Sequence, residues 1–214
     1  MRADLSVYLV IGAGFTEGRE LIPLVLEAVA GGVTLVQLRE KTADSRAFTA
    51  EAAALKAALA PTGVPLLIND NVAVARASGA DGVHLGQSDL SCAEARRLLG
   101  PGACIGLSVE TRAQALEAEA LGADYLGVSP VFPSASKTDT AAPWGLDGLR
   151  WLRERVKQPL VAIGGITVEN AAGVVRAGAH GVAVISAIGS AASPRAAAAA
   201  LRRVVAEAAL NQRP

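Results

Sequence analysis

The sequence has few cysteines, few aromatic residues and no excess of charge of either sign. Its two cysteines, Cys92 and Cys104, exclude a disulfide framework, and their spacing matches no zinc or redox motif. The 20 basic and 20 acidic residues give a formal net charge of zero, so we expect no nucleic-acid partner and no general attraction to an anionic membrane. The apolar stretch at residues 5–11 is short and predicts a first strand rather than a signal peptide or a transmembrane span, so we expect a cytoplasmic protein.

The sequence also lacks the patterns of several catalytic classes. Neither of its two histidines, His84 and His180, has a Cys, Ser or Asp partner at a spacing that would activate a nucleophile. No P-loop is present, and Gly12-Ala13-Gly14 lacks the rest of a dinucleotide fingerprint. We therefore expect chemistry without a protein nucleophile, and we interpret His84 as a packed histidine or one that supports a ligand-contacting neighbour.

Small apolar residues are abundant, and they fall in short segments that alternate with helical stretches. Hydrophobic residues make up 51% of the chain, which is enough for a sizeable core. Apolar runs typical of buried parallel strands occupy residues 7–11, 34–38, 64–68, 82–85, 103–107, 125–128, 160–163 and 181–185. Helical stretches follow them at residues 19–30, 45–60, 72–78, 92–99, 111–121, 146–156, 168–176 and 194–209. This order predicts an α/β protein with a single (β/α)8 TIM-barrel domain over residues 1–214, with an open doubly wound sheet as the alternative.

A weak internal repeat marks where several of these strands begin. Residues 79–81, 122–124 and 178–180 read Gly-Ala-Asp, Gly-Ala-Asp and Gly-Ala-His, and each triplet lies between a predicted helix and the next strand. The glycine can supply the left-handed turn that follows a helix. We therefore assign the last residue of each triplet to folding at the bottom of the barrel, not to chemistry: Asp81, Asp124 and His180.

Polar residues cluster after the predicted strands, at the end of the barrel where such enzymes place their active sites. Gln37, Arg39 and Lys41 alternate at the end of the second strand, so they share one side of the extended chain. A guanidinium fork, an ammonium group and an amide together suit a diphosphate. The alternative is a surface salt bridge with Glu40, which points the other way.

Two carboxylates end the neighbouring third and fourth strands. Asp70 and Asp89 can therefore meet over the barrel mouth. Two carboxylates with diphosphate oxygens and water make a suitable Mg²⁺ site, because Mg²⁺ favours hard oxygen ligands. The alternative for each residue is a helix N-cap, which is common where a loop leads from a strand into a helix.

The last three strands are followed by segments that suit a phosphate monoester and a lid. Gly164-Gly165 and Ile185-Ser186 each precede a predicted helix, whose N-terminus would attract an anion. The segment at residues 129–137 is long and carries hydroxyls and a cation, so it is a candidate for a loop that closes over substrate. The alternatives are an ordinary tight turn for the glycines and an ordinary surface loop for residues 129–137.

Together these strand ends resemble the thiamine-phosphate synthase family over nearly the whole chain. The resemblance runs in order through Gln37-Leu-Arg-Glu-Lys41, Ile68-Asn-Asp70, Gly82-Val-His-Leu-Gly-Gln-Ser-Asp89, Gly106-Leu-Ser108, Pro133-Ser-Ala-Ser-Lys137, Ala162-Ile-Gly-Gly-Ile166 and Ile185-Ser186. The first and third motifs are fairly specific, whereas the Gly-Gly-Ile turn is shared by many phosphate-binding barrels. The family joins the methylene carbon of an aminopyrimidine diphosphate to the nitrogen of a thiazole phosphate and releases diphosphate.

The resemblance implies a role for each polar residue at the mouth. The pyrimidine diphosphate would be held by Gln37, Arg39, Lys41, Asn69, Ser108 and Lys137. The thiazole phosphate would be held by Ser134, Ser136, Gly165, Ile185 and Ser186. Asp70 and Asp89 would bind Mg²⁺, and Arg39 and Lys137 would stabilise the leaving group.

The chain departs from the family pattern mainly in the loop after the sixth strand. It has Ser134 and Ser136 where the family usually has threonines, so the hydroxyls are kept and two methyl groups are lost. Two other functions stay open: a thiazole tautomerase of the same superfamily, which needs no diphosphate clamp, and a non-catalytic barrel that binds a phosphate metabolite. The expected partners are small-molecule substrates, and association with further copies of the chain is left open.

Overall fold

A computed structural model of the protein describes residues 3–41, 43–118, 120–133 and 142–210. Parallel strands pair in sequence order, and β1 pairs with β8, so the sheet closes into a barrel. The strands are β1 (Val7–Ile11), β2 (Leu35–Leu38), β3 (Leu66–Asn69), β4 (Gly82–Leu85), β5 (Cys104–Val109), β6 (Tyr125–Val128), β7 (Leu160–Ile163) and β8 (Gly181–Val184). The predicted (β/α)8 barrel is confirmed, and pairing of β1 with β8 excludes the open sheet.

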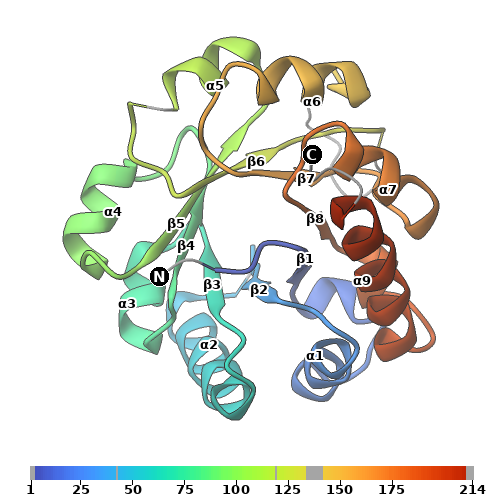
Figure 1. The fold of residues 1–214 in the computed structure, drawn as a ribbon. Coiled ribbons are helices and arrows are strands. Elements are labelled where there is room, and N and C mark those ends of the chain that lie inside the picture. Colours follow the sequence, from blue (N-terminus) through green and yellow to red (C-terminus); the bar gives the residue numbers. More distant parts are fainter. Residues whose placement is uncertain (1–2, 42, 119, 134–141, 211–214) are drawn as a thin grey trace.

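Helices form a ring around these strands (Figure 1). They are α1 (Leu21–Ala30), α2 (Ser45–Leu59), α3 (Val72–Ser78), α4 (Cys92–Leu99), α5 (Arg112–Glu117), α6 (Gly145–Arg153), α7 (Val168–Arg176), α8 (Ser186–Gly189) and α9 (Pro194–Leu210), with short 3₁₀ helices η1 (Ala13–Phe15) and η2 (Ala60–Thr62). The long helix α9 lies between α7 and α1 and so completes the ring. Of the described helices, none has both the length and the apolar character needed to cross a bilayer.

The bounds of many elements differ from the sequence expectation by one or more residues, and two of these differences have a clear local cause. Strand β3 begins at Leu66 and not at residue 64, because Pro65 has no N–H to give to the ladder. Helix α5 begins at Arg112 because Thr111 is its N-cap, with a capping box to Gln114. Helix α8 and both 3₁₀ helices were not predicted, since segments this short show no helical periodicity.

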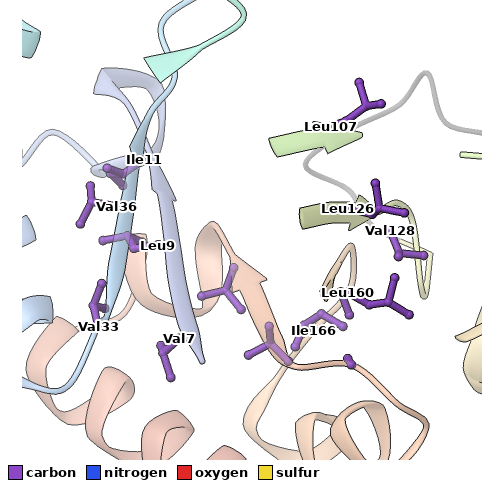
Figure 2. Close-up of a cluster of buried hydrophobic side chains, with 14 of the residues drawn as sticks. Val7, Leu9, Ile11, Val33, Val36, Leu107, Leu126, Val128, Leu160 and Ile166 are labelled. Carbon is purple, nitrogen blue, oxygen red and sulfur yellow. The ribbon is translucent and has the colours of Figure 1, made fainter. Parts of the chain in front are cut away.

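Alternate residues of each strand point into the barrel or out towards the helices. On β1, Val7, Leu9 and Ile11 belong to the outer hydrophobic cluster and project from the same side of the strand (Figure 2). Tyr8 and Val10, between them, belong to a separate cluster inside the barrel. This alternation determines which residues can line a site at the barrel mouth, because every second residue near the end of a strand points towards the barrel axis.

The repeat identified in the sequence fixes the lower ends of neighbouring strands. An Asp81 carboxylate oxygen accepts the Leu66 N–H at 2.8 Å, and Asp124 accepts the Ile105 N–H at 2.7 Å. His180 accepts the Leu160 N–H through Nδ1 at 3.1 Å. In each case a residue just before an even-numbered strand bonds to the start of the preceding one. This geometry agrees with a folding role for the three residues.

Candidate active site

A cavity of about 490 Å³ opens at the carboxyl ends of the strands. This volume lies within the roughly 300 to 1,000 Å³ of small-molecule sites. Eight of the predicted site residues line it: Gln37, Arg39, Lys41, Asn69, Asp70, Asp89, Ser108 and Ile185. Residues from as far apart as β2 and β8 therefore meet in one place.

The cationic side of the cavity is formed by the end of β2. Arg39 is half-buried and Lys41 is exposed, and the Arg39 guanidinium lies 5.9 Å from the centre of the Phe15 ring. The Glu40 carboxylate faces the other way and accepts the Ala13 N–H at 2.5 Å. Glu40 therefore secures the start of η1, and both cations line the cavity.

Asp70 and Asp89 lie close together at the ends of the neighbouring strands β3 and β4, next to the cationic end of β2. Burial raises the pKa of Asp70 to about 6, assisted by a hydrogen bond to Asp89 and by its negative charge. Asn69 and Arg39 act in the opposite direction on that pKa. Asp70 also has φ 61°, in the left-handed region, and strained backbone of this kind is found at functional sites.

Neither aspartate caps a helix, so the alternative expected for them is wrong. The N-cap of α3 is Asn71, whose side chain accepts the Val74 N–H at 3.0 Å. The N-cap of α4 is Ser91. An Asp89 oxygen instead accepts the Gly86 N–H at 2.6 Å, within the turn after β4. Both carboxyl groups thus belong to the cavity wall.

The aspartate pair has the chemistry of a divalent-cation site. Its donors are hard carboxylate oxygens, and a bound cation would relieve the repulsion that keeps the pKa of Asp70 high. Within the described residues, no group of three or more His, Cys, Asp or Glu side chains could hold a metal ion. A cation at Asp70 and Asp89 would therefore take its remaining ligands from substrate and water.

The predicted thiazole-phosphate residues are brought together less completely. Ile185 lines the cavity, whereas Gly165 and Ser186 lie outside its lining. A Cβ atom on Gly165, where φ is 62°, would lie 2.6 Å from the Pro133 carbonyl oxygen. Helix α7 begins only at Val168, so the glycine pair shapes a tight turn and does not form the first turn of that helix. Ser134, Ser136 and Lys137 lie outside the described residues.

Several lining residues were given no role by the sequence analysis: Tyr8, Gln87, Glu110, Gln114 and Tyr125. Gln87 donates to the Ser108 carbonyl oxygen at 2.6 Å and so joins the ends of β4 and β5. Tyr8 and Tyr125 occupy inward positions of β1 and β6. In the sequence, each of these tyrosines is a polar aromatic residue within an apolar run. That pattern is also typical of an ordinary core residue, so it did not indicate a place in the cavity.

Comparison with known proteins identifies the family. A family model described as thiamine monophosphate synthase matches residues 7–188. The thiamine-phosphate synthase of Albidiferax ferrireducens is 54% identical over 201 residues, which cover 94% of this chain and 92% of that protein. The thiamine-phosphate synthase of Chloroflexus aurantiacus is 49% identical, with 94% and 93% covered. The solved thiamine phosphate pyrophosphorylase from Pyrococcus furiosus superposes with a TM-score of 0.87 at 38% identity, covering 96% of this chain and 98% of that one. The chain belongs to the thiamine monophosphate synthase family of enzymes.

Proposed function

We propose that this barrel catalyses the reaction for which its relatives are named. It joins an aminopyrimidine that carries a diphosphooxymethyl group to a thiazole phosphate, and the products are thiamine phosphate and diphosphate. The observation that carries the proposal is the meeting of two cations, Arg39 and Lys41, with two carboxyl groups, Asp70 and Asp89, in one cavity. An isomerase acting on a thiazole phosphate alone has no use for such a diphosphate site.

The cations act on the leaving group. When the bond between the methylene carbon and the diphosphate oxygen breaks, the oxygen keeps the electron pair and negative charge grows on the diphosphate. The Arg39 fork and the Lys41 ammonium group, which both line the cavity, would stabilise that charge. The amino group of the ring spreads the positive charge of the carbon, and the thiazole nitrogen supplies the electron pair of the new C–N bond. We give Lys137 the same role as Arg39.

We propose Mg²⁺ as the cofactor, held by Asp70 and Asp89. When bound, the ion supplies positive charge beside the departing diphosphate. Support comes from the two carboxyl groups that share a hydrogen bond at the cavity wall and from the absence of a capping role for either.

The remaining assignments place the two rings. Gln37, Asn69 and Ser108 line the inner part of the cavity and would contact the aminopyrimidine. The thiazole phosphate would bind at the other side of the mouth, near β7 and β8. The residues proposed for it are Ser134, Ser136, Gly165, Ile185 and Ser186.

The proposal is tested by mixing the purified protein with both substrates, with and without Mg²⁺, and measuring thiamine phosphate and diphosphate. We expect the two products in equal amounts, and only with a divalent cation. Binding of both substrates without product would identify a non-catalytic barrel. Turnover of a thiazole phosphate without the pyrimidine would identify an isomerase.

A further inference from the structure

A chain of hydrogen-bonded side chains crosses the inside of the barrel at the base of the cavity. Gln37 Nε2 donates to the Tyr8 hydroxyl at 2.5 Å, and that hydroxyl lies 3.0 Å from the Tyr125 hydroxyl. The Tyr125 hydroxyl lies 2.8 Å from His84 Nδ1, and His84 Nε2 lies 2.9 Å from Ser108 Oγ. The two ends, Gln37 and Ser108, come from β2 and β5, and all five residues line the cavity.

The strands leave room for this chain. A Cβ atom on Gly106 would lie 2.2 Å from Tyr125 Cζ and 2.4 Å from His84 Nδ1. A Cβ atom on Gly127 would lie 2.8 Å from His84 Cε1. The His84 and Tyr125 rings stack with centroids 5.5 Å apart. Two inward-facing glycines thus provide the space in which the ring pair is held.

The chain contains buried polar groups that must be satisfied. Tyr8 and Tyr125 are each 1% exposed and Gln37 is 3% exposed. Burial raises the pKa of both tyrosines, so each hydroxyl keeps its single proton. A buried hydroxyl group without a hydrogen-bond partner is costly. Each hydroxyl in this series of side chains must therefore donate its proton to one particular neighbour.

The amide at one end sets that direction. Because the Tyr8 hydroxyl accepts from Gln37, its own proton goes to Tyr125. The Tyr125 proton then goes to His84 Nδ1, which leaves the imidazole proton on Nε2. Nε2–H donates to Ser108 Oγ. The Ser108 hydroxyl proton is therefore available to a ligand, while the Gln37 amide oxygen serves as an acceptor.

We propose that Tyr8, Tyr125 and His84 are positioning residues that make Ser108 a hydrogen-bond donor and Gln37 an acceptor towards the aminopyrimidine. The inference rests on the proposed function, since the ring nitrogen and the amino group of that substrate are the matching acceptor and donor. A ligand with the reverse pattern would leave a polar group unpaired at both ends, and such mismatches are discriminated strongly.

The first test is a double-mutant cycle in the enzyme assay. Tyr125→Phe removes one hydroxyl and keeps the ring, and Ser108→Ala removes the final donor. We expect each variant to raise KM for the pyrimidine diphosphate about tenfold, with KM for the thiazole phosphate unchanged. The double variant is expected to be no worse than Ser108→Ala alone, because Tyr125 acts through Ser108. Multiplication of the two effects would overturn the inference, as would wild-type KM in Tyr125→Phe.

Cys104→Ala is the matched control. Cys104 lies in the same inner cluster as both tyrosines but does not line the cavity. We expect this change to lower the melting temperature and leave both KM values as in the wild type. If Cys104→Ala raised the pyrimidine KM as much as Tyr125→Phe does, the effect of Tyr125→Phe would come from disturbed packing and not from the hydrogen bonds.

The second test needs no variant and no turnover. The protein has only two histidines, so ¹⁵N-histidine NMR resolves each imidazole. We expect His84 to hold its proton on Nε2 and to accept at Nδ1. A proton on Nδ1 would contradict the inference even if thiamine phosphate is formed. Failure of the wild-type protein to form thiamine phosphate would instead reject the proposed function, so the two failures are distinguishable.

Discussion

At the scale of single residues, the aspartate pair is the clearest departure from what stability alone would favour. Asp70 has a left-handed backbone and a carboxyl group that shares a hydrogen bond with Asp89. Asn71 and Ser91, close to them in sequence, carry out the capping. The pair therefore adds repulsion to the fold, and the only structural bond described for either carboxylate outside the pair's own surroundings is the Gly86 N–H that Asp89 accepts in the turn after β4.

The repulsion gives a pH-dependent stability. The pKa of Asp70 is about 6 in the fold and has a reference value of 3.8, so between these values the folded state binds more protons than the unfolded state. Stability attributable to this group therefore falls as pH rises through that window. We expect Asp70→Asn, without divalent cations, to gain stability relative to the wild type between pH 4 and pH 8. The gain should be less than about 1 kcal/mol, because the carboxyl group is only partly withdrawn from solvent at the cavity mouth and solvent still screens its charge.

Asn is a suitable replacement because it tolerates the left-handed backbone. Any change in unfolding free energy that does not depend on pH cancels when the two pH values are compared. The control is Asp147→Asn, on an exposed side chain of α6. Urea unfolding at both pH values measures the difference. A gain in Asp70→Asn that is the same at pH 4 and pH 8 would show that the carboxyl group is not the cause.

Arg39 provides the second prediction at this scale. Arg39→Ala removes the guanidinium fork from the side of the cavity where we propose that diphosphate binds, and we expect kcat/KM to fall by about 100-fold or more. Arg46→Ala, on the exposed start of α2, is the control for loss of one positive charge. Steady-state kinetics of the two variants measures the difference in kcat/KM. Equal kcat/KM values in the two variants would reject the role of Arg39.

The sequence predicts a site residue well when its position relative to a strand is enough to place it at the barrel mouth. Gln37, Arg39, Asn69 and Ser108 follow or end strands, so the fold class alone brings them together. The links between Tyr8, Tyr125 and His84 were not predictable, because they join residues 41 and 117 positions apart in the chain. Only the register of the closed barrel sets those distances.

At the scale of elements, strand β5 carries an unusual requirement for glycine. Gly106→Ala would place a methyl group against the Tyr125 ring, and overpacking of this kind costs about 1 to 3 kcal/mol. We expect a lower free energy of unfolding and a raised pyrimidine KM. Gly173→Ala in α7 is the matched control, because its Cβ would meet only Leu146, at 3.6 Å. Equal stability of the two variants in urea would contradict the account of the inner glycines.

Even four-residue strands were predictable from their apolar runs, whereas very short helices were not. Strands β1, β4, β6 and β7 and helices α3, α4 and α7 have the predicted bounds. Helix α8 was missed because four residues after β8 show no periodicity. The position of α8 decides where Ser186 lies, so the residues proposed for the thiazole phosphate were less predictable than those proposed for the diphosphate.

At the scale of the whole molecule, closure of the sheet is what makes the site. Pairing of β1 with β8 brings the first and last strands together, and the inward residues of every strand then face one axis. The alternation of eight strands with helices was sufficient to predict this closure. The side chains that fill the interior decide what the cavity binds.

The most direct test of this account is calorimetric binding of inorganic diphosphate, with and without Mg²⁺, to the wild-type protein, Arg39→Ala and Asp70→Asn. The account predicts that Mg²⁺ tightens binding to the wild type, that Arg39→Ala weakens binding under both conditions, and that Asp70→Asn abolishes the gain from Mg²⁺. An equal gain from Mg²⁺ in Asp70→Asn and in the wild type would contradict it.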